Sequence, residues 1–383
     1  MELLNATKMQ AGYTMGMGPD GRESLVIVVK GTFRLPEKGS QEPVLADEQV
    51  PLVMADTFAG DPGFSAPIYE SEFPPRKPKC DILLNGSAYA PGGRPTKRVL
   101  VSLQIGNWRK SFAVVGNRVW KKGLFGVSAT KPEPFTVMPI SYGNAFGGTD
   151  TSHEKPEKHK FVLANPVGRG FHHRLSSKLV KGMPLPNTEE EGRPVKKPGG
   201  AYRPMAFGPV GRNWDPRYKL AGTYDQAWID NIFPFLPSDF QEAYYQSAPV
   251  DQQIPYLRGG EVVTLTNLTR EGSDRFRIPT VEMPIVFFPR KGDKQQTQGV
   301  IDTLLIEPDQ RRFMLTWRSS YALKRNMFDV GQVVAGIMPR AWYRARELGK
   351  TYYPSLGALV AAKMSGLEEG EEHGLVGRCT AMR

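Results

Sequence analysis

The sequence predicts a mainly β fold of the β-rich α+β class. It consists of antiparallel, sandwich-like sheets with long Pro/Gly-rich loops and a short C-terminal helix. Two observations lead to this prediction. The 383 residues include 40 glycines and 33 prolines, and both residue types break helices and mark turns. Several short segments also alternate between apolar and polar residues at period two, which is typical of half-buried strands.

The first two strands are predicted on either side of a tight turn. Residues 11–17 are strand-like, and residues 24–33 (SLVIVVKGTF) return as a buried strand. The sequence PDG between them favours a turn because proline presets φ, aspartate caps locally and glycine accepts a positive φ. Residues 36–98 are expected to form a long loop-rich excursion with a short strand at Cys80–Leu84.

The clearest pattern is RVLVSLQIGNWRKSFAVVGNRVW at residues 98–120. Apolar residues alternate with others along its first eight positions, and two Gly-Asn pairs follow ten residues apart. Gly-Asn pairs at this spacing are typical of hairpin turns. We therefore predict an antiparallel meander of three strands.

The remaining elements are predicted from shorter signals. A short helix is expected over residues 223–231 and a second over 354–366, where Pro354 and Gly366 stand at the ends that each residue type prefers. The expected strands are residues 260–268, 283–288, 299–306 and 311–317, with the last two forming a hairpin.

These elements predict four regions. Residues 1–140 form a β-rich N-terminal region that contains the meander. Residues 141–255 form a loop-rich region with many aromatic and basic residues. Residues 256–345 form a C-terminal β region packed on the first, and residues 346–383 form a helix followed by a flexible tail.

The charge of the chain favours acidic partners. The formal net charge is +11, and the interval between Asp81 and Glu133 contains nine basic residues and no acid. A field of this sign attracts nucleic acid, anionic membranes or acidic proteins, although a solvated basic face accounts for it equally well. Nucleic acid is the less favoured partner because the basic residues are scattered among prolines and glycines.

Cysteine usage and the N-terminus predict a cytoplasmic protein. Cys80 and Cys379 lie almost a full chain apart, which excludes a disulfide framework. The opening sequence MELLNATKMQAG lacks the apolar segment of a signal peptide. No apolar run is long enough to span a bilayer, and we predict no membrane partner.

No motif for catalysis stands out. Cys80 is followed by a carboxylate, which raises rather than lowers a thiol pKa, so a packing role is favoured. The glycine-rich sequences NAFGGTD and VGRGFHHR lack the Gly-Lys-Ser/Thr of a phosphate loop. Adjacent His172 and His173 diverge from each other and match no metal motif. We predict no enzyme, no metal and no cofactor, and keep a hydrolase or nuclease using His172 and His173 as an alternative.

Aromatic and arginine residues suggest a binding surface instead. They gather in the irregular, proline-rich stretch 212–245, and both types are enriched at binding hot spots. A loop-rich core that relies on large side chains is the other explanation. The candidate partner-binding residues are Arg109, Lys110, Lys121, Lys122, Arg169, Arg212, Trp214, Trp228, Tyr244 and Tyr245.

Five blocks of the sequence resemble a family of uncharacterised domains that occurs in bacterial type VI secretion gene clusters. The blocks keep the family's order and lie within roughly residues 1–330. They are NATKMQAGYTMGMGPDGRESLVIVVKGTF (5–33), LVMADTFAGDPGFSAPIYESEFPPRKPKCDILLNGSAYAPGG (52–93), MPISYGNAFGG (138–148), NPVGRGF (165–171) and FGPVGRNWDPR (207–217).

The resemblance implies a non-catalytic adaptor or chaperone. Such a protein binds an effector toxin, often in the N-terminal region of the toxin, and helps load it onto the valine-glycine repeat spike protein. It implies a bacterial cytoplasmic protein that associates with the secretion apparatus, and it supplies no catalytic residue. A nucleic-acid-binding protein, suggested by the +11 charge, remains a further alternative.

Overall fold

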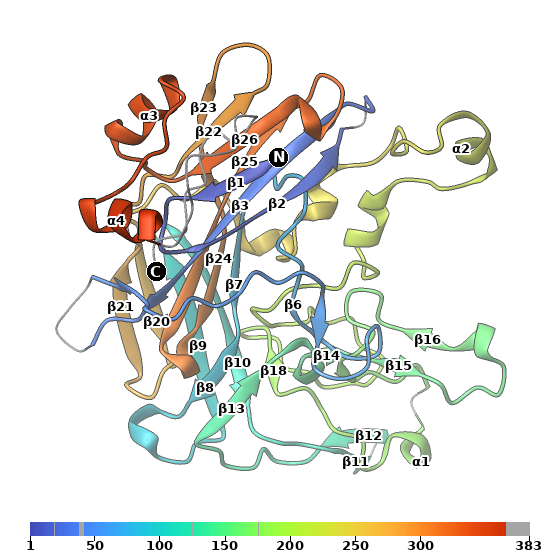
Figure 1. Cartoon of the computed structure of the whole chain (residues 1–383). Coiled ribbons are helices and arrows are strands. Elements are labelled where there is room, and N and C mark those ends of the chain that lie inside the picture. Colours follow the sequence, from blue (N-terminus) through green and yellow to red (C-terminus); the bar gives the residue numbers. More distant parts are fainter. Residues whose placement is uncertain (19, 38–41, 124–125, 175, 365–383) are drawn as a thin grey trace.

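The computed structural model describes residues 1–364 apart from 19, 38–41, 124–125 and 175. The protein is mainly β, with several antiparallel sheets and a few short helices (Figure 1), so the predicted fold class is confirmed. Pro19 of the first predicted turn, Gly366 at the end of the predicted C-terminal helix and the predicted flexible tail lie outside the described residues. Within those residues, no helix is both long and apolar enough to cross a membrane.

The largest sheet has seven strands. Their order is β19-β7-β24-β25-β3-β2, and β4 pairs with the end of β3. Only β7 and β24 run parallel. The predicted hairpins β2–β3 and β24–β25 are confirmed. The strands are β2 (Gln10–Met17), β3 (Glu23–Arg34), β4 (Val44–Leu45), β7 (Cys80–Leu84), β19 (Gln253–Ile254), β24 (Val300–Glu307) and β25 (Arg312–Ala322).

A five-stranded sheet has the order β18-β10-β9-β20-β21. Its central hairpin β9–β10 turns at Gly106, which has a φ of 53°, as the first Gly-Asn pair predicted. The strands are β9 (Arg98–Ile105), β10 (Trp108–Val115), β18 (Thr188–Glu189), β20 (Val262–Thr266) and β21 (Ser273–Arg277).

The predicted third strand of the meander is wrong. The chain leaves the sheet after β10, and β11 (Trp120–Gly123) pairs with β12 (Gly126–Ala129) in a separate two-stranded sheet. A Cβ on Gly116 would lie 1.8 Å from the carbonyl oxygen of Glu133. Glycine is therefore needed at 116 for close backbone packing and not for a hairpin turn.

A four-stranded sheet and a helix form one end of the molecule. The order is β1-β26-β22-β23, and Trp342 of α3 packs against the sheet with Leu4 and Val334. Helix α3 was not predicted, whereas α4 corresponds to the predicted C-terminal helix. The elements are β1 (Glu2–Asn5), β22 (Pro284–Pro289), β23 (Gln295–Gln298), β26 (Val330–Ala335), α3 (Arg340–Glu347) and α4 (Leu356–Met364).

Short strand pairs and two helices make up the rest. Helix α2 lies within the predicted 223–231 helix. The remaining elements are β5 (Thr57–Phe58), β6 (Pro67–Tyr69), β8 (Gly86–Tyr89), β13 (Val137–Ile140), β14 (Phe146–Gly147), β15 (Thr149–Asp150), β16 (Lys160–Phe161), β17 (Arg169–Gly170), α1 (Ser177–Val180) and α2 (Gln226–Asn231).

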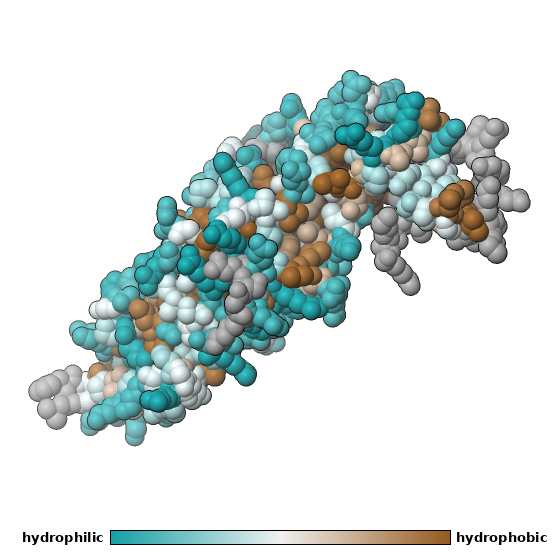
Figure 2. All heavy atoms as spheres, turned by 90° about the vertical axis from the view of Figure 1, so that its left-hand side faces the viewer, coloured by the Kyte–Doolittle hydropathy of each residue, from teal (hydrophilic) through white to brown (hydrophobic). Residues whose placement is uncertain are grey.

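The two large sheets share one apolar core. Ile27, Ile82 and Leu315 of the seven-stranded sheet belong to the same buried cluster as Leu103 and Leu265 of the five-stranded sheet. Two sheets that bury their inner faces against each other form a sandwich-like core. Seen from the side that carries α3 and α4, the molecule is elongated, with apolar groups scattered over a mostly hydrophilic surface (Figure 2).

Candidate partner-binding site

Four charged side chains join two distant blocks of the sequence. Glu70 accepts hydrogen bonds from Arg217 Nη1 at 2.7 Å and Nη2 at 2.5 Å. Arg212 Nη2 lies 2.6 Å from Glu70 Oε1, and Arg212 Nε donates to Asp56 at 2.9 Å. The carboxylates come from the second family-like block and the arginines from the fifth, so the two blocks form one charged cluster.

This arginine–carboxylate cluster is structural. Arg217 is only 3% exposed and also donates to the carbonyl oxygens of Val210 and Tyr244. Burial alone lowers the pKa of Arg212, but the Asp56 hydrogen bond and the charge of Glu70 raise it. The predicted contact residue Arg212 is thus engaged inside the protein, where it anchors the chain that leads into the aromatic stretch.

A closed loop, Gly222–Gln241, follows this anchor, and we call it the aromatic loop. Its ends meet because Gln241 N donates to the carbonyl oxygen of Leu220 at 2.9 Å. The backbone N–H and hydroxyl of Thr223 also donate to the Asp239 carboxylate at 2.9 and 2.8 Å. Ends tied in this way are typical of compact Ω-loops. Figure 1 shows the loop, with α2 at its tip, projecting from the sheets.

The aromatic loop packs against itself around Trp228. The ring of Trp228 lies edge-on to Tyr224 at 4.8 Å and to Phe233 at 5.5 Å, and its Nε1 donates to the carbonyl of Phe235. No residue of the loop belongs to the three buried apolar clusters of the described chain. Four of its large apolar side chains are instead exposed: Tyr224 52%, Ile229 53%, Phe233 65% and Phe235 46%.

The other aromatic candidates lie at two different depths. Tyr244 and Tyr245 are half-buried and pack on Phe240 beside the base of the aromatic loop. Trp214 is only 2% exposed and packs edge-on against Tyr142 in the main core. Trp214 therefore cannot contact a partner at the surface.

The basic candidate residues also differ in their exposure to solvent. Lys110 is buried and donates to Asp251 and Gln252, so it too is inaccessible to a partner. Arg109 on β10 is exposed, as are the two neighbouring lysines on β11, Lys121 and Lys122.

Arg169 links neighbouring loops through hydrogen bonds. It is half-buried, its Nε donates to the carbonyl of Gly143 at 2.9 Å, and its other nitrogens donate to Asn144 and Asn187. Burial lowers the pKa of Arg169. The side chain thus fastens the glycine-rich sequences to each other rather than pointing to solvent.

The two glycine-rich sequences form a structural clamp. Strands β14 and β17 run parallel, with Gly147 opposite Gly170. A Cβ on Gly147 would lie 2.1 Å from the carbonyl oxygen of Asn165. The amide of Asn165 donates to the carbonyls of Tyr142 and Phe146 at 2.8 and 3.1 Å. These glycines permit close approach of two backbones, which leaves no room there for a phosphate.

The histidine pair lies beside a buried carboxylate. Asp150 accepts from the backbone N–H groups of Ser152 at 2.9 Å and His173 at 3.0 Å, and lies 3.2 Å from His172 Nδ1. Burial raises the pKa of Asp150, but the hydrogen bonds from Ser152 and His173 and the charge of His172 lower it. Asp150 therefore holds the backbone turn and is a weak base.

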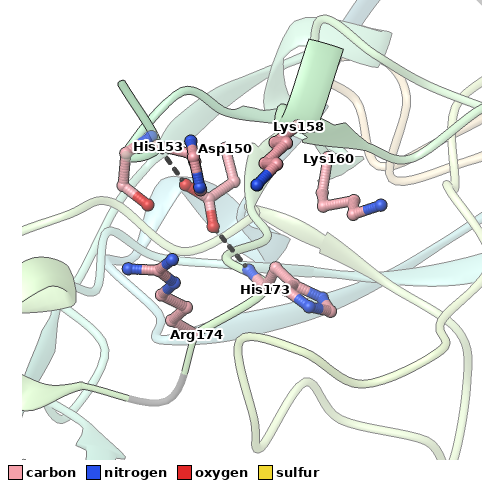
Figure 3. A pocket seen from close by; sticks show the side chains of 7 residues that line it. Asp150, His153, Lys158, Lys160, His173 and Arg174 are labelled. Carbon is pink, nitrogen blue, oxygen red and sulfur yellow. Dashed lines mark hydrogen bonds between the residues drawn. The ribbon is translucent and has the colours of Figure 1, made fainter. Parts of the chain in front are cut away.

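A cavity of about 350 Å³ opens next to this carboxylate (Figure 3). Its lining is basic, and His172 does not reach it. Across the described residues, no group of three or more His, Cys, Asp or Glu side chains is placed to hold a metal ion. The lining residues are Asp150, Ser152, His153, Lys158, Lys160, His173 and Arg174.

Cys80 is completely buried on β7. Burial raises the pKa of its thiol, and Asp302 and Asp81 raise it further. A thiol with a raised pKa is a poor nucleophile at neutral pH, so Cys80 acts as a packing residue.

The sequence model of one bacterial family matches residues 20–318 of the chain. This stretch includes the arginine–carboxylate cluster, both glycine-rich sequences and the aromatic loop. No curated protein and no solved structure matches the chain. Because the match spans most of its length, the chain belongs to the family described as "Uncharacterized protein conserved in bacteria (DUF2169)".

Proposed function

We propose that the protein is a non-catalytic adaptor or chaperone that binds a type VI secretion effector and helps load it onto the valine-glycine repeat spike protein. The proposal rests on the resemblance of the five sequence blocks and on one structural feature, the exposed aromatic loop. A bacterial cytoplasmic location next to the secretion apparatus is part of the same proposal.

The aromatic loop has the properties of a protein-binding element. Its exposed side chains are large and apolar, and its closed backbone and internal ring packing hold them in place before a partner arrives. Burying one such side chain in an interface contributes about 1.5–3 kcal/mol. Preorganised aromatic residues also lose little conformational entropy on binding.

The sites that suggested chemistry support binding rather than catalysis. The glycine-rich sequences are filled by their own backbone, Cys80 is buried, and the oxygens of Asp150 already accept hydrogen bonds from the neighbouring backbone. A nucleophile needs a base within reach and a third group that orients the base. The described residues around His172 and Cys80 do not provide that arrangement.

Co-purification tests the proposal directly. We expect the tagged protein to recover an effector or the spike protein from among the products of its neighbouring genes, as identified by mass spectrometry. The salt dependence of the complex shows whether exposed Arg109, Lys121 and Lys122 contribute, since surface charges are screened by salt. Recovery of the protein alone, or with nucleic acid, would overturn the proposal.

A triple variant tests whether effector binding depends on the aromatic loop rather than on another part of the surface. We expect Tyr224→Ser, Ile229→Ser and Phe233→Ser together to weaken effector binding by about tenfold or more, since each loses apolar contact area. The thermal midpoint should move by less than about 2 °C because these side chains lie outside the core. The matched control is Phe64→Ser, which changes an 88% exposed phenylalanine elsewhere and should leave binding intact.

A further inference from the structure

Strand β2 is the last strand of the seven-stranded sheet. It pairs with β3 from Gln10 opposite Lys30 to Met17 opposite Glu23, without interruption. Within the described residues no strand pairs with its other edge. On an antiparallel edge strand, alternate backbone N–H and C=O groups point away from the sheet. Among the described residues, no backbone–backbone hydrogen bond outside the β2–β3 ladder engages residues 10–17.

This edge lacks the features that normally protect one. Natural edge strands are short, charged, bulged or interrupted by proline, because an unprotected edge pairs with other chains. Strand β2 has eight residues, QAGYTMGM, with no charge and no proline. The other end strands of the three large sheets, as described in the structure, are short or charged: β18 and β19 have two residues each, β23 has four, β21 reads SDRFR, and β1 has four residues with a glutamate.

The edge lies next to the aromatic loop. A Cβ on Gly21, in the turn between β2 and β3, would lie 2.8 Å from Phe235 Cε1. Phe235 therefore rests on the end of the β2–β3 hairpin while remaining 46% exposed. Tyr13 in the middle of β2 is 43% exposed as well. An extended peptide on the β2 edge would run toward the aromatic loop.

The charge of the molecule favours a foreign segment over a second copy of the chain. Two copies that each carry a net charge of +11 repel each other. The absence of charge on β2 also favours an uncharged segment, because a charge placed opposite it has no ion-pair partner on the strand. Thr, Tyr and Met side chains on β2 suit apolar and β-branched residues across the new pair.

We propose that the effector adds an extended, uncharged segment as a new strand on the free edge of β2, with one end against the aromatic loop. The inference rests on the proposed adaptor function and specifies its binding mode. In strand addition, backbone hydrogen bonds supply affinity and side-chain contacts supply specificity.

Hydrogen exchange of backbone amides tests the binding mode. In the complex of the full chain with its effector, we expect the outward-pointing amides of Gln10–Met17 to exchange more slowly than in the free protein, by a factor of at least about ten. The edge strand β23 serves as the control and should exchange at the same rate in both states. Protection of the aromatic loop without protection of β2 would overturn strand addition and leave the adaptor function standing.

Two other outcomes are distinct. Failure of any effector to form a complex would overturn both the adaptor function and the binding mode. Protection of β2 in the free protein that increases with protein concentration would identify a second copy of the chain as the occupant, which contradicts an effector segment.

A charged residue placed on the edge provides a second test. Lysine on an edge strand opposes strand addition, so we expect Tyr13→Lys to weaken effector binding by about tenfold while the thermal midpoint stays unchanged. Gln296→Lys on β23 places the same residue on another exposed edge and should bind normally. Unchanged affinity of Tyr13→Lys would contradict the proposal.

Discussion

Charged residues inside this β-rich protein act in groups. Asp81 is fully buried and accepts hydrogen bonds from Lys77 Nζ at 2.8 Å, Gln246 Nε2 at 2.5 Å and Ser247 N at 2.8 Å. Burial alone lowers the pKa of Lys77, yet the charges of Asp81 and Asp302 raise it. A buried charge that loses its partner costs several kcal/mol, so these groups fix how the covering segments lie on the sheet.

Lys110 differs from Lys77 because burial dominates its titration. Burial lowers the pKa of Lys110 to about 8, against the opposing attraction of Asp251. A lysine in an unfolded chain has a pKa of about 10.4. Between these values the folded protein has lost a proton that the unfolded chain retains, so stability must rise with pH in this window.

We expect this rise to depend on Lys110. The free energy of unfolding of the wild type, minus that of Lys110→Met, should increase by about 2 kcal/mol from about pH 8 to about pH 10. Denaturant unfolding of both proteins across this range measures the difference. The control Lys121→Met makes the same substitution at an exposed lysine. A difference that does not change with pH for Lys110→Met would contradict the assigned pKa.

At the scale of elements, the hairpin turns could be predicted from the sequence, but the pairing of strands distant in the sequence could not. The hairpins β2–β3, β9–β10 and β24–β25 follow from local alternation and turn residues. Pairing of β3 with β25, where Leu25 faces Tyr321, joins strands almost 300 residues apart. No local signal encodes such a pairing, because it depends on which faces bury each other.

The structural role of a glycine is equally hard to predict from local sequence. Gly106 and Gly116 stand in identical Gly-Asn pairs, yet only Gly106 has a positive φ, whereas Gly116 packs against another backbone segment. A single sequence cannot distinguish a glycine required for its φ from one required for its missing side chain.

The β14–β17 clamp allows this second role to be measured. A Cβ at residue 147 would clash with the Asn165 carbonyl, so we expect Gly147→Ala to destabilise the protein by about 3 kcal/mol or more, the range of severe overpacking. Gly143→Ala is the control in the same loop, since its nearest neighbour would be Ser141 Oγ at 3.6 Å. Thermal or denaturant unfolding of the two variants gives the comparison. Equal stability would mean that the clamp can open without penalty.

At the scale of the whole molecule, the proposed binding surface and part of the core come from the same aromatic stretch of the sequence. The aromatic stretch was identified from composition alone, but composition could not separate Trp214 in the core from Phe233 at the surface. That separation depends on the anchor between Glu70 and Arg217, which are 147 residues apart. Long-range ion pairs of this kind decide which part of an aromatic stretch is exposed.

Each of the two large sheets combines strands from the N-terminal and the C-terminal parts of the chain. β24 and β25 lie between β7 and β3, and β20 lies beside β9, so strands from residues 256–345 complete sheets that begin within residues 1–140. Removing central strands exposes apolar faces on both sides of the core. Folding of the N-terminal part should therefore require the C-terminal strands.

Truncation tests this dependence. We expect a fragment of residues 1–255 to lack a cooperative unfolding transition, because it loses β20, β24 and β25 together with their share of the common core. A fragment of residues 1–355, which lacks only α4 and the residues after it, should keep one transition close to that of the full chain. Circular dichroism during thermal and denaturant unfolding compares the three proteins. A cooperative transition in residues 1–255 would show that the N-terminal strands form an independent domain and that the shared sheets assemble only afterwards.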